Sequence, residues 1–319
     1  MICMTGQQYS LFQIEKLLKE VGYIPEPAIV SACWNVLNFR EFLLIEGEPG
    51  SGKSELAKAL SRMIKGELFY CECHSEVGFS DLFYQTPLAE SETGEIPSAS
   101  ELRSMFDEIR PGPVVRAFLN ETPSVLLLDE IDKLSLECCH TLLRILADRE
   151  TTLFGWVPLK PVSLVLIVAT SNGRTKFSRE FMDRFSYCSL DLPSKQKEME
   201  ILAKTYPQAS TQLIEDVANC MAFLRTSRFE YPPSLRAAKQ IVERAIKLGK
   251  TQLDRDLMIA CCTLLVKTTI DQRRLQENFQ SLIVYVENGR LKKPQCSQLN
   301  TQSKISNSGS TALNRGWCS

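Results

Sequence analysis

The stretch from Gly47 to Ser54 contains the residue types that hold the phosphates of a nucleotide. It matches the pattern G-x-x-x-x-G-K-[ST] through Gly47, Glu48, Pro49, Gly50, Ser51, Gly52, Lys53 and Ser54. Glycines let main-chain N–H groups curl around phosphate oxygens, the lysine reaches the β- and γ-phosphates, and the final hydroxyl binds Mg²⁺. An ordinary glycine-rich turn is the alternative. The apolar stretch before the motif and the helical pattern after it favour a phosphate-binding loop.

Two consecutive acidic residues, Asp129 and Glu130, follow the apolar run Val125–Leu128. An apolar strand that ends in Asp129 places a carboxylate at the carboxyl edge of a parallel sheet, beside the phosphate loop. We predict that Asp129 holds Mg²⁺ through water and that Glu130 orients or deprotonates the attacking water. Taken alone, the run could be a strand that enters a surface loop. Its pairing with residues 47–54 favours the catalytic interpretation.

Alternating strand and helix patterns surround both motifs. Short apolar runs predict strands at 40–47, 66–73, 124–128, 161–170 and 186–192. Helical spacing of apolar residues predicts helices at 8–20, 27–37, 54–64, 99–109, 114–119 and 134–147. Because strands that alternate with helices form parallel sheets, we predict an α/β fold, a P-loop NTPase αβα core with a parallel sheet.

The strand pattern ends at Pro193, and helical patterns continue the chain. They cover 195–205, 211–226, 233–248 and 253–267, with a further helix or strand at 270–286. We therefore predict a small all-α lid domain after the core. The predicted organisation is an N-terminal helical segment at 1–24, the P-loop core at 25–193, the lid at 194–287 and a disordered polar, basic tail at 288–319.

Composition limits the classes of protein that fit. The 319 residues include 37 Lys and Arg against 38 Asp and Glu, so the net charge of −1 gives no hint of a polyanionic partner. The apolar stretch Val162–Ala169 is far too short to span a bilayer, and the polar first ten residues do not resemble a secretory signal. We expect a cytoplasmic protein without a membrane span.

Twelve cysteines raise the question of disulfides or metal. The expected reducing compartment argues against disulfides. Cys71, Cys73 and His74 form one cluster in sequence, and Cys138, Cys139 and His140 form another. Together they could supply zinc ligands, although the spacing lacks the usual C-x(2–4)-C turn. Ordinary buried thiols are the alternative, and the sequence leaves the choice open.

The combined motifs resemble those of the AAA+ ATPases. Asp129 and Glu130 resemble a Walker B motif, and the strand that ends in Ala169-Thr-Ser-Asn172 resembles sensor 1. The phrases EGEPGSGKSELAKAL, FYCECHSEVGFSDLFYQ, PGPVVRAF and LLLDEIDKL are most similar to the MoxR branch. The resemblance covers about 25–285 and implies Mg²⁺-dependent hydrolysis of ATP to ADP and phosphate.

The resemblance also implies roles for three further residues. Asn172 would bind the γ-phosphate or the lytic water, and an arginine finger at Arg184 would complete a neighbouring subunit's site. Arg236 would reach the γ-phosphate from the lid of the same subunit. Each has an ordinary alternative: Asn172 could be a turn residue, Arg184 could form a structural ion pair while Arg179 acts as the finger, and Arg236 could be a solvated helix residue.

For the MoxR branch, the resemblance implies a homo-oligomer, most often a hexameric ring. It also implies a client protein or complex that is remodelled or matured, often with a von Willebrand A-type partner. Residues 74–123 are long and poorly patterned, and the resemblance implies an insertion in helix 2 within this region, whose course the sequence does not define. Phe79, Phe83 and Tyr84 in that segment could grip a client at a central pore, or could belong to the core.

Two rival functions remain open. A DNA-directed AAA+ motor or loader would need a basic groove and steeply salt-dependent binding, which the near-neutral charge does not support. A nucleotide-gated scaffold would bind ATP with negligible turnover, but Glu130, Asn172 and Arg184 argue against it. The chain lacks the guanine signature N-K-x-D, so ATP is preferred over GTP. We expect the base between residues 22–30 and the helical lid.

Overall fold

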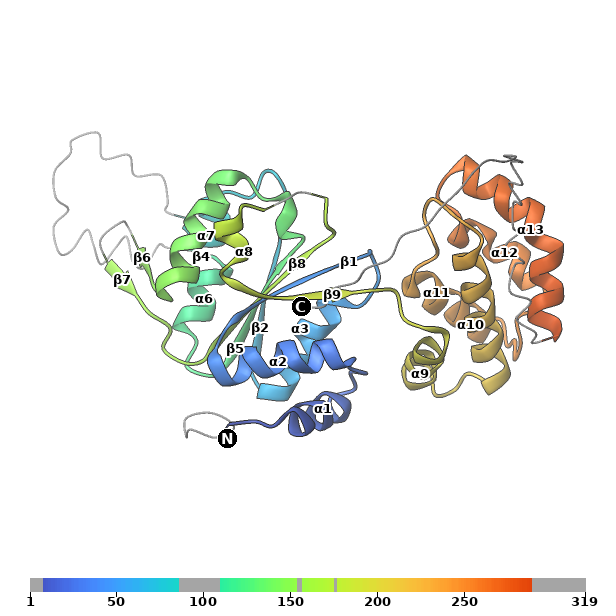
Figure 1. The fold of residues 1–319 in the computed structure, drawn as a ribbon, viewed down its shortest axis with the longest axis horizontal. Coiled ribbons are helices and arrows are strands. Elements are labelled where there is room, and N and C mark those ends of the chain that lie inside the picture. The colour runs from blue at the N-terminus through green and yellow to red at the C-terminus, as the bar shows by residue number, and fades with distance from the viewer. Residues whose placement is uncertain (1–7, 86–109, 154–156, 175–176, 289–319) are drawn as a thin grey trace, which may run out of the picture.

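The computed structural model describes residues 8–85, 110–153, 157–174 and 177–288. It consists of two lobes that lie side by side along the longest axis (Figure 1). The first lobe is a sheet covered by helices on both faces, and the second is built from helices alone. The predicted P-loop αβα core followed by a helical region is therefore confirmed.

The central sheet has five parallel strands in the order β2-β5-β8-β1-β9. The strands are β1 (Phe42–Gly47), β2 (Glu67–Glu72), β5 (Ser124–Asp129), β8 (Val165–Ser171) and β9 (Phe185–Leu190). Five of the six residues of β5 are buried, as expected for a parallel strand covered on both faces. All five predicted strands are present. The strand predicted from residue 161 begins only at Val165, because the Val162 N–H instead donates to the Phe118 carbonyl at the end of a helix.

Strand register brings the two sequence motifs to one edge of the sheet. Glu46 on β1 lies beside Ser171 on β8, and Leu128 on β5 lies beside Ala169 on β8. Since all three strands run in the same direction, the phosphate loop after β1, the acidic pair after Leu128 and Asn172 after β8 meet at the carboxyl edge.

Each face of the sheet has its own hydrophobic cluster. On one face lie α1 (Leu11–Glu20), α2 (Pro27–Phe39) and α3 (Lys53–Ile64). The other cluster includes residues of α4 (Phe79–Leu82), α6 (Pro113–Leu119), α7 (Leu136–Asp148) and α8 (Arg179–Met182), and Ile131 of the short 3₁₀ helix η1 (Ile131–Lys133). Local signals start these helices. Ser10 forms a capping box with Gln13, and Ser135 accepts from the Cys138 N–H at the start of α7.

Two small hairpins were not expected from the sequence. In one, β3 (Tyr84–Gln85) pairs with β4 (Arg110–Pro111), and in the other β6 (Thr151–Leu153) pairs with β7 (Val157–Leu159). The predicted helix at 99–109 and most of the predicted loop at 85–100 lie outside the described residues. Within the 74–123 segment, the described residues on either side of 86–109 are thus paired with each other through β3 and β4.

The second lobe contains five helices in the described part of the chain and encloses a third hydrophobic cluster. The helices are α9 (Lys195–Thr205), α10 (Thr211–Thr226), α11 (Leu235–Lys247), α12 (Arg255–Leu265) and α13 (Thr269–Asn288). The stretch from 270, which the sequence left as helix or strand, is helical. Over the described residues, each helix is too short or too polar to cross a membrane.

Candidate nucleotide-binding site

The phosphate-binding loop connects the end of β1 to the start of α3. Gly50 and Gly52 have φ angles of 83° and 105°, which glycine adopts readily and other residues rarely do. Gly47 is needed for a different reason, because a Cβ atom on it would lie 2.1 Å from the carbonyl oxygen of Leu190 in β9. At Gly52, no described atom lies within 4 Å of such a Cβ. The loop is therefore packed tightly at its start and open where α3 begins.

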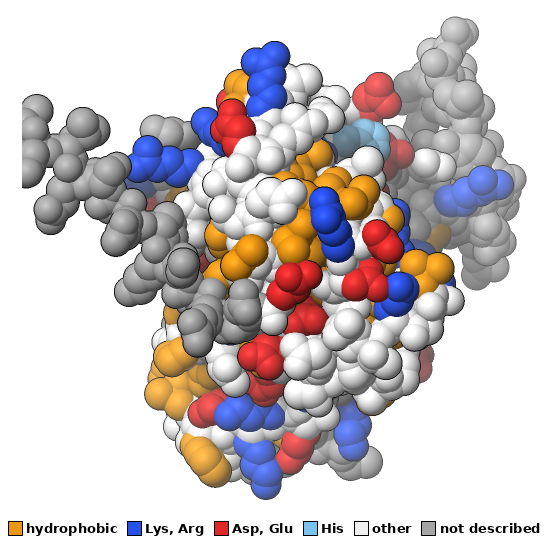
Figure 2. Space-filling model, turned by 90° about the vertical axis from the view of Figure 1, so that its right-hand side faces the viewer, with side chains coloured by type: hydrophobic (Ala, Val, Ile, Leu, Met, Phe, Trp, Pro, Cys, Tyr) orange, Lys and Arg blue, Asp and Glu red, His pale blue; other side chains and the backbone are white. Residues whose placement is uncertain are grey.

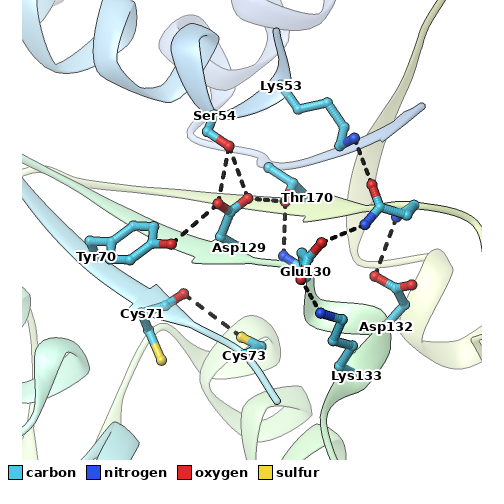
Figure 3. A network of polar contacts seen from close by, with 11 residues as sticks. Lys53, Ser54, Tyr70, Cys71, Cys73, Asp129, Glu130, Asp132, Lys133 and Thr170 are labelled. Atoms are coloured by element: carbon cyan, nitrogen blue, oxygen red, sulfur yellow. Dashed lines mark hydrogen bonds and ion pairs between the residues drawn. The ribbon is translucent and has the colours of Figure 1, made fainter. Parts of the chain in front are cut away.

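Lys53 is the first residue of α3, and its side chain reaches back across the loop (Figure 3). Its ammonium group donates to the carbonyl oxygens of Gly47 at 2.7 Å and Glu48 at 3.1 Å, and to Oδ1 of Asn172 at 2.9 Å. Burial lowers the pKa of Lys53, while the nearby carboxylates oppose that shift. The positive charge is thus held at the centre of the loop.

The loop has the features that a bound phosphate requires. Ser51 Oγ is buried and has no hydrogen-bond partner among the described residues. A buried hydroxyl without a partner is unfavourable, and a phosphate oxygen would satisfy it. The amino end of α3 and the Lys53 ammonium group both favour an anion at the same place. The residues present therefore fit the triphosphate of a nucleotide.

The Asp129 carboxylate accepts hydrogen bonds from three hydroxyl groups (Figure 3). Ser54 Oγ lies 3.0 and 3.1 Å from its two carboxylate oxygens. Thr170 donates to Oδ1, and the Tyr70 hydroxyl donates to Oδ2 at 3.4 Å. Burial, followed by the charge of Asp129, raises the pKa of Tyr70 to about 12, so this phenol remains a donor. Because Mg²⁺ prefers oxygen ligands, Ser54 and Asp129 fit the predicted metal site.

Glu130 is held by a chain of polar contacts that leads back to Lys53 (Figure 3). Its Oε1 accepts from Nδ2 of Asn172 at 2.7 Å, and its Oε2 forms an ion pair with Lys133. Its backbone is left-handed, with φ 56° and ψ 46°, and its N–H donates to Thr170 Oγ1 at 2.9 Å. The hydrogen bond from Lys133, and secondarily that from Asn172, lowers the pKa of Glu130. The carboxylate is therefore held between Lys133 and Asn172, and Asn172 connects it to Lys53 of the phosphate loop.

A pocket of about 1090 Å³ opens beside the loop, between the sheet and the second lobe. It is lined on one side by Glu48, Gly50 and Asn172, and on the other by residues of α11, among them Arg236. Arg236 is exposed within this pocket, so it faces the same space as the predicted γ-phosphate ligands. The structure brings these predicted residues together.

Arg184 lies elsewhere. It is exposed, directly before β9, and it is not among the described residues that line the pocket beside the loop. Arg179, the competing finger, is also exposed and lies 4.0 Å from the Asp183 carboxylate. Neither arginine reaches the phosphate loop of its own subunit through any described contact.

A second pocket, of about 260 Å³, lies on the opposite side of the phosphate loop. Its walls come from the segment Val21–Ile24, from Ser51 and Gly52, and from α9 and α11. Lys197 of α9 also bridges to Glu26 at 2.7 Å, which ties the second lobe to the start of α2. This pocket lies where the sequence predicts the base, between residues 22–30 and the lid, and base binding there stays a prediction.

Four residues of this network were not found by sequence reasoning: Tyr70, Lys133, Thr170 and Asp132, whose Oδ1 accepts from the Asn172 N–H at 3.3 Å. Thr170 lies inside the stretch that resembles sensor 1, where only Asn172 was singled out. Tyr70 could have been found only with the strand order in hand, since β2 must first be placed beside β5. Lys133 lies three residues after Glu130 on η1, a spacing that does bring side chains together on helical turns.

The cysteine and histidine clusters do not form a metal site in the described residues, where no group of three or more His, Cys, Asp or Glu is arranged to hold an ion. Cys73 and Cys138 are buried in the core cluster, whereas His74 and His140 are exposed. All nine described cysteines are free thiols. Cys73 and Cys138 are thus buried thiols and Cys71 and Cys139 are partly buried, and whether the clusters bind metal stays open.

The aromatic residues near β3 differ in burial, and a role in gripping a client stays a prediction. Phe83 is fully buried in the core, and Phe79 stacks on it with ring centroids 4.4 Å apart. Tyr84 packs edge-on to Phe79 at 5.4 Å and is half-buried. Of the three, Phe79 is the most exposed, at 42%.

The strand order, the helix-covered parallel sheet and the phosphate loop define a P-loop fold of the AAA+ type. The family comparison agrees, since residues 42–185 match the AAA domain of the dynein-related subfamily. Residues 42–185 are therefore similar to that domain, over somewhat less than half of the chain. The match does not distinguish the MoxR branch, which stays a prediction.

Comparison with solved structures finds the RuvB Holliday junction branch migration motor of Thermotoga maritima. That protein is 16% identical, with 84% of this chain and 76% of that chain covered and a TM-score of 0.44. A variant of the same protein gives 16% identity, coverage of 85% and 76%, and a TM-score of 0.44. This likeness is too distant to bear on what the chain binds. No curated protein matches the chain.

Proposed function

We propose that this chain is a Mg²⁺-dependent ATPase that couples hydrolysis in an oligomeric ring to the remodelling or maturation of a partner protein. The observation that carries the proposal is the continuous chain of contacts from Lys53 through Asn172 to Glu130, next to the Ser54–Asp129 pair. A phosphate-binding lysine, a metal-binding pair and a carboxylate base are the groups that phosphoryl transfer to water requires.

The residues would divide the work as follows. Lys53 and the loop N–H groups would bind the β- and γ-phosphates, and Ser54 and Asp129 would hold a Mg²⁺ ion, which would supply positive charge to the phosphates. Glu130 accepts a proton from the attacking water, and Asn172 fixes the position of that water or of the γ-phosphate. Arg236 would contact the γ-phosphate from the pocket that it lines with Asn172.

Oligomerisation is part of the proposal because Arg184 has no role within its own subunit in the described contacts. An exposed arginine beside β9 is suited to enter a neighbour's site, as a finger in trans. We infer a ring, most simply a hexamer, of the kind formed in the MoxR branch. A protein client, with or without a von Willebrand A-type partner, would be acted on in the cytoplasm, a location that agrees with the free thiols described above.

Nucleic acid is a less suitable partner. The chain carries nearly equal numbers of acidic and basic residues. On the face of the helical lobe that Figure 2 shows, acidic side chains lie among the basic ones. A phosphate backbone is bound by clustered positive charge, which such a surface does not offer.

Multiple-turnover release of phosphate from ATP tests the proposal. The wild type should turn over, and Glu130→Gln should retain ATP, lose turnover and stabilise the oligomer. A protein that binds ATP but releases phosphate no faster than Glu130→Gln would be a nucleotide-gated scaffold, and the enzymatic proposal would be wrong.

Subunit mixing tests the role of Arg184. Lys53→Ala and Arg184→Ala should each be inactive alone, because one lacks a phosphate ligand and the other lacks the finger. Mixed rings contain intact sites at some interfaces, so activity should return in part. Arg179→Ala is the matched control and should be active alone. If no ratio of the two inactive variants restores activity, Arg184 does not act in trans.

A further inference from the structure

The segment from Glu230 to Ser234 precedes α11 and lies against the phosphate-binding loop. It lines the pocket of about 1090 Å³ together with Gly50. A Cβ atom on Gly50 would lie 2.8 Å from the Cβ of Ser234, so the two segments are in close contact. Arg236 follows on the first turn of α11. The position of the 230–234 segment therefore decides where Arg236 meets the loop.

One guanidinium group, that of Arg225 at the end of α10, holds this segment from inside the lobe. Its Nε donates to the Pro233 carbonyl at 3.0 Å, and its Nη1 donates to the Pro193 carbonyl at 3.2 Å. Both terminal nitrogens also donate to the Glu198 carboxylate, at 3.0 and 2.8 Å. Arg225 thus joins the linker after β9, helix α9 and the 230–234 segment.

The other end of the segment is held by Asp271 of α13. Its two carboxylate oxygens accept from the backbone N–H groups of Glu230 at 2.8 Å and Tyr231 at 3.1 Å. The Asp271 side chain is fully buried. The segment that touches the phosphate loop is therefore fixed at both ends by charged side chains.

Burial makes the Arg225 contacts strong and specific. The Glu198 side chain is 0% exposed and that of Arg225 is 14% exposed. A buried ion pair does not by itself argue for stability. Two of the four hydrogen bonds, however, go to the backbone carbonyls of Pro193 and Pro233. Pro193 lies in the linker that enters the lobe, and Pro233 lies in the segment against the phosphate loop, so these bonds fix the position of both segments. The planar fork of arginine can serve several acceptors at once, which a lysine ammonium group cannot reproduce.

We propose that Arg225 is a positioning residue for Arg236: it holds the 230–234 segment in register with the inter-lobe linker, so that Arg236 meets the phosphate loop in one geometry. This inference rests on the proposed function, because it takes Arg236 to contact the γ-phosphate. It predicts that Arg225 affects recognition of the γ-phosphate without touching the nucleotide.

Binding of two nucleotides separates this role from a merely structural one. Arg225→Lys keeps the positive charge beside Glu198 but cannot make all four bonds. We expect it to lower the affinity for a non-hydrolysable ATP analogue by about tenfold, equivalent to about 1.4 kcal/mol. The affinity for ADP should fall by about twofold or less. Arg236→Ala should show the same pattern, and the double variant should lose no more than Arg236→Ala alone.

The controls keep the test decisive. Arg273→Lys, on the exposed side of α13, should change neither affinity. Glu198→Gln is a second variant for the case in which Arg225→Lys unfolds the lobe. It keeps a neutral acceptor for Arg225, and it should likewise reduce affinity for the ATP analogue more than affinity for ADP. The inference is wrong if Arg225→Lys lowers the affinities for the ATP analogue and for ADP equally. It is also wrong if the double variant loses the product of the two single-variant affinity losses. In both cases the ATPase proposal stands. A wild type that binds neither nucleotide overturns both.

Discussion

Replacing Gly47 with alanine should separate β1 from β9 at the root of the phosphate loop. The added Cβ would lie 2.1 Å from the Leu190 carbonyl oxygen, far inside the 3.4 Å at which ordinary contact begins. Gly47 and Leu190 are paired in register, so the strands can make room only by losing ladder hydrogen bonds at this end. Overpacking together with one or two lost hydrogen bonds costs about 2–4 kcal/mol.

Thermal unfolding measures this cost directly. For a lobe of this size, a loss of about 2–4 kcal/mol lowers the Tm by about 5–15 °C. Affinity for a Mg²⁺-bound ATP analogue should fall as well, because the loop begins at the displaced residue. Gly249→Ala is the control: its φ is 65° with no described atom within 4 Å of the new Cβ, so it bears only the conformational cost, about 1 kcal/mol. A Gly47→Ala protein that melts at the same temperature as the wild type would refute the steric reasoning.

Other predictions concern the metal pair and the buried ion pair. Under the proposed function, Ser54→Ala should raise the Mg²⁺ concentration for half-maximal phosphate release by about tenfold, since one metal ligand contributes on the order of 1–2 kcal/mol. Tyr70→Phe should change the same quantity by about twofold or less, because its hydrogen bond to Asp129 is long, at 3.4 Å; a larger shift would make Tyr70 part of the metal site. Glu198→Ala leaves the Arg225 charge without its partner and should destabilise the helical lobe by about 3–5 kcal/mol, seen as an earlier melting transition. Unchanged melting would show that solvent or another group compensates Arg225.

Local patterns were sufficient to predict the phosphate loop, the acidic pair and most elements. Residues 47–54 owe their conformation to glycines at fixed spacing, and Asp129 owes its place to the buried run before it. In the helical lobe, α9, α10 and α12 begin at the capping residues Ser194, Ser210 and Asp254, and each of these side chains accepts from the backbone N–H three residues later. Such information is contained within a few neighbouring residues, so a single sequence reveals it.

Contacts that depend on strand order or on lobe packing could not be predicted in the same way. Tyr70 reaches Asp129 because β2 is next to β5, and Arg225 reaches Pro193 and Glu198 across about thirty residues of chain. The strands of the two hairpins have only two or three residues each, too few for any periodicity. These features arise from tertiary structure, and the residue types involved are common on ordinary surfaces.

All three N–H groups of the Lys53 ammonium group already have acceptors within the protein. An incoming phosphate must therefore exchange internal hydrogen bonds for new ones, and does not simply add to them. The heat released on association is the difference between two sets of charge-assisted bonds, and it is smaller than the contacts of the complex alone would suggest. The same exchange would free Asn172 Oδ1 from Lys53, while the other end of the Asn172 amide donates to Glu130, so under the proposed function nucleotide binding would be coupled to the position of Glu130.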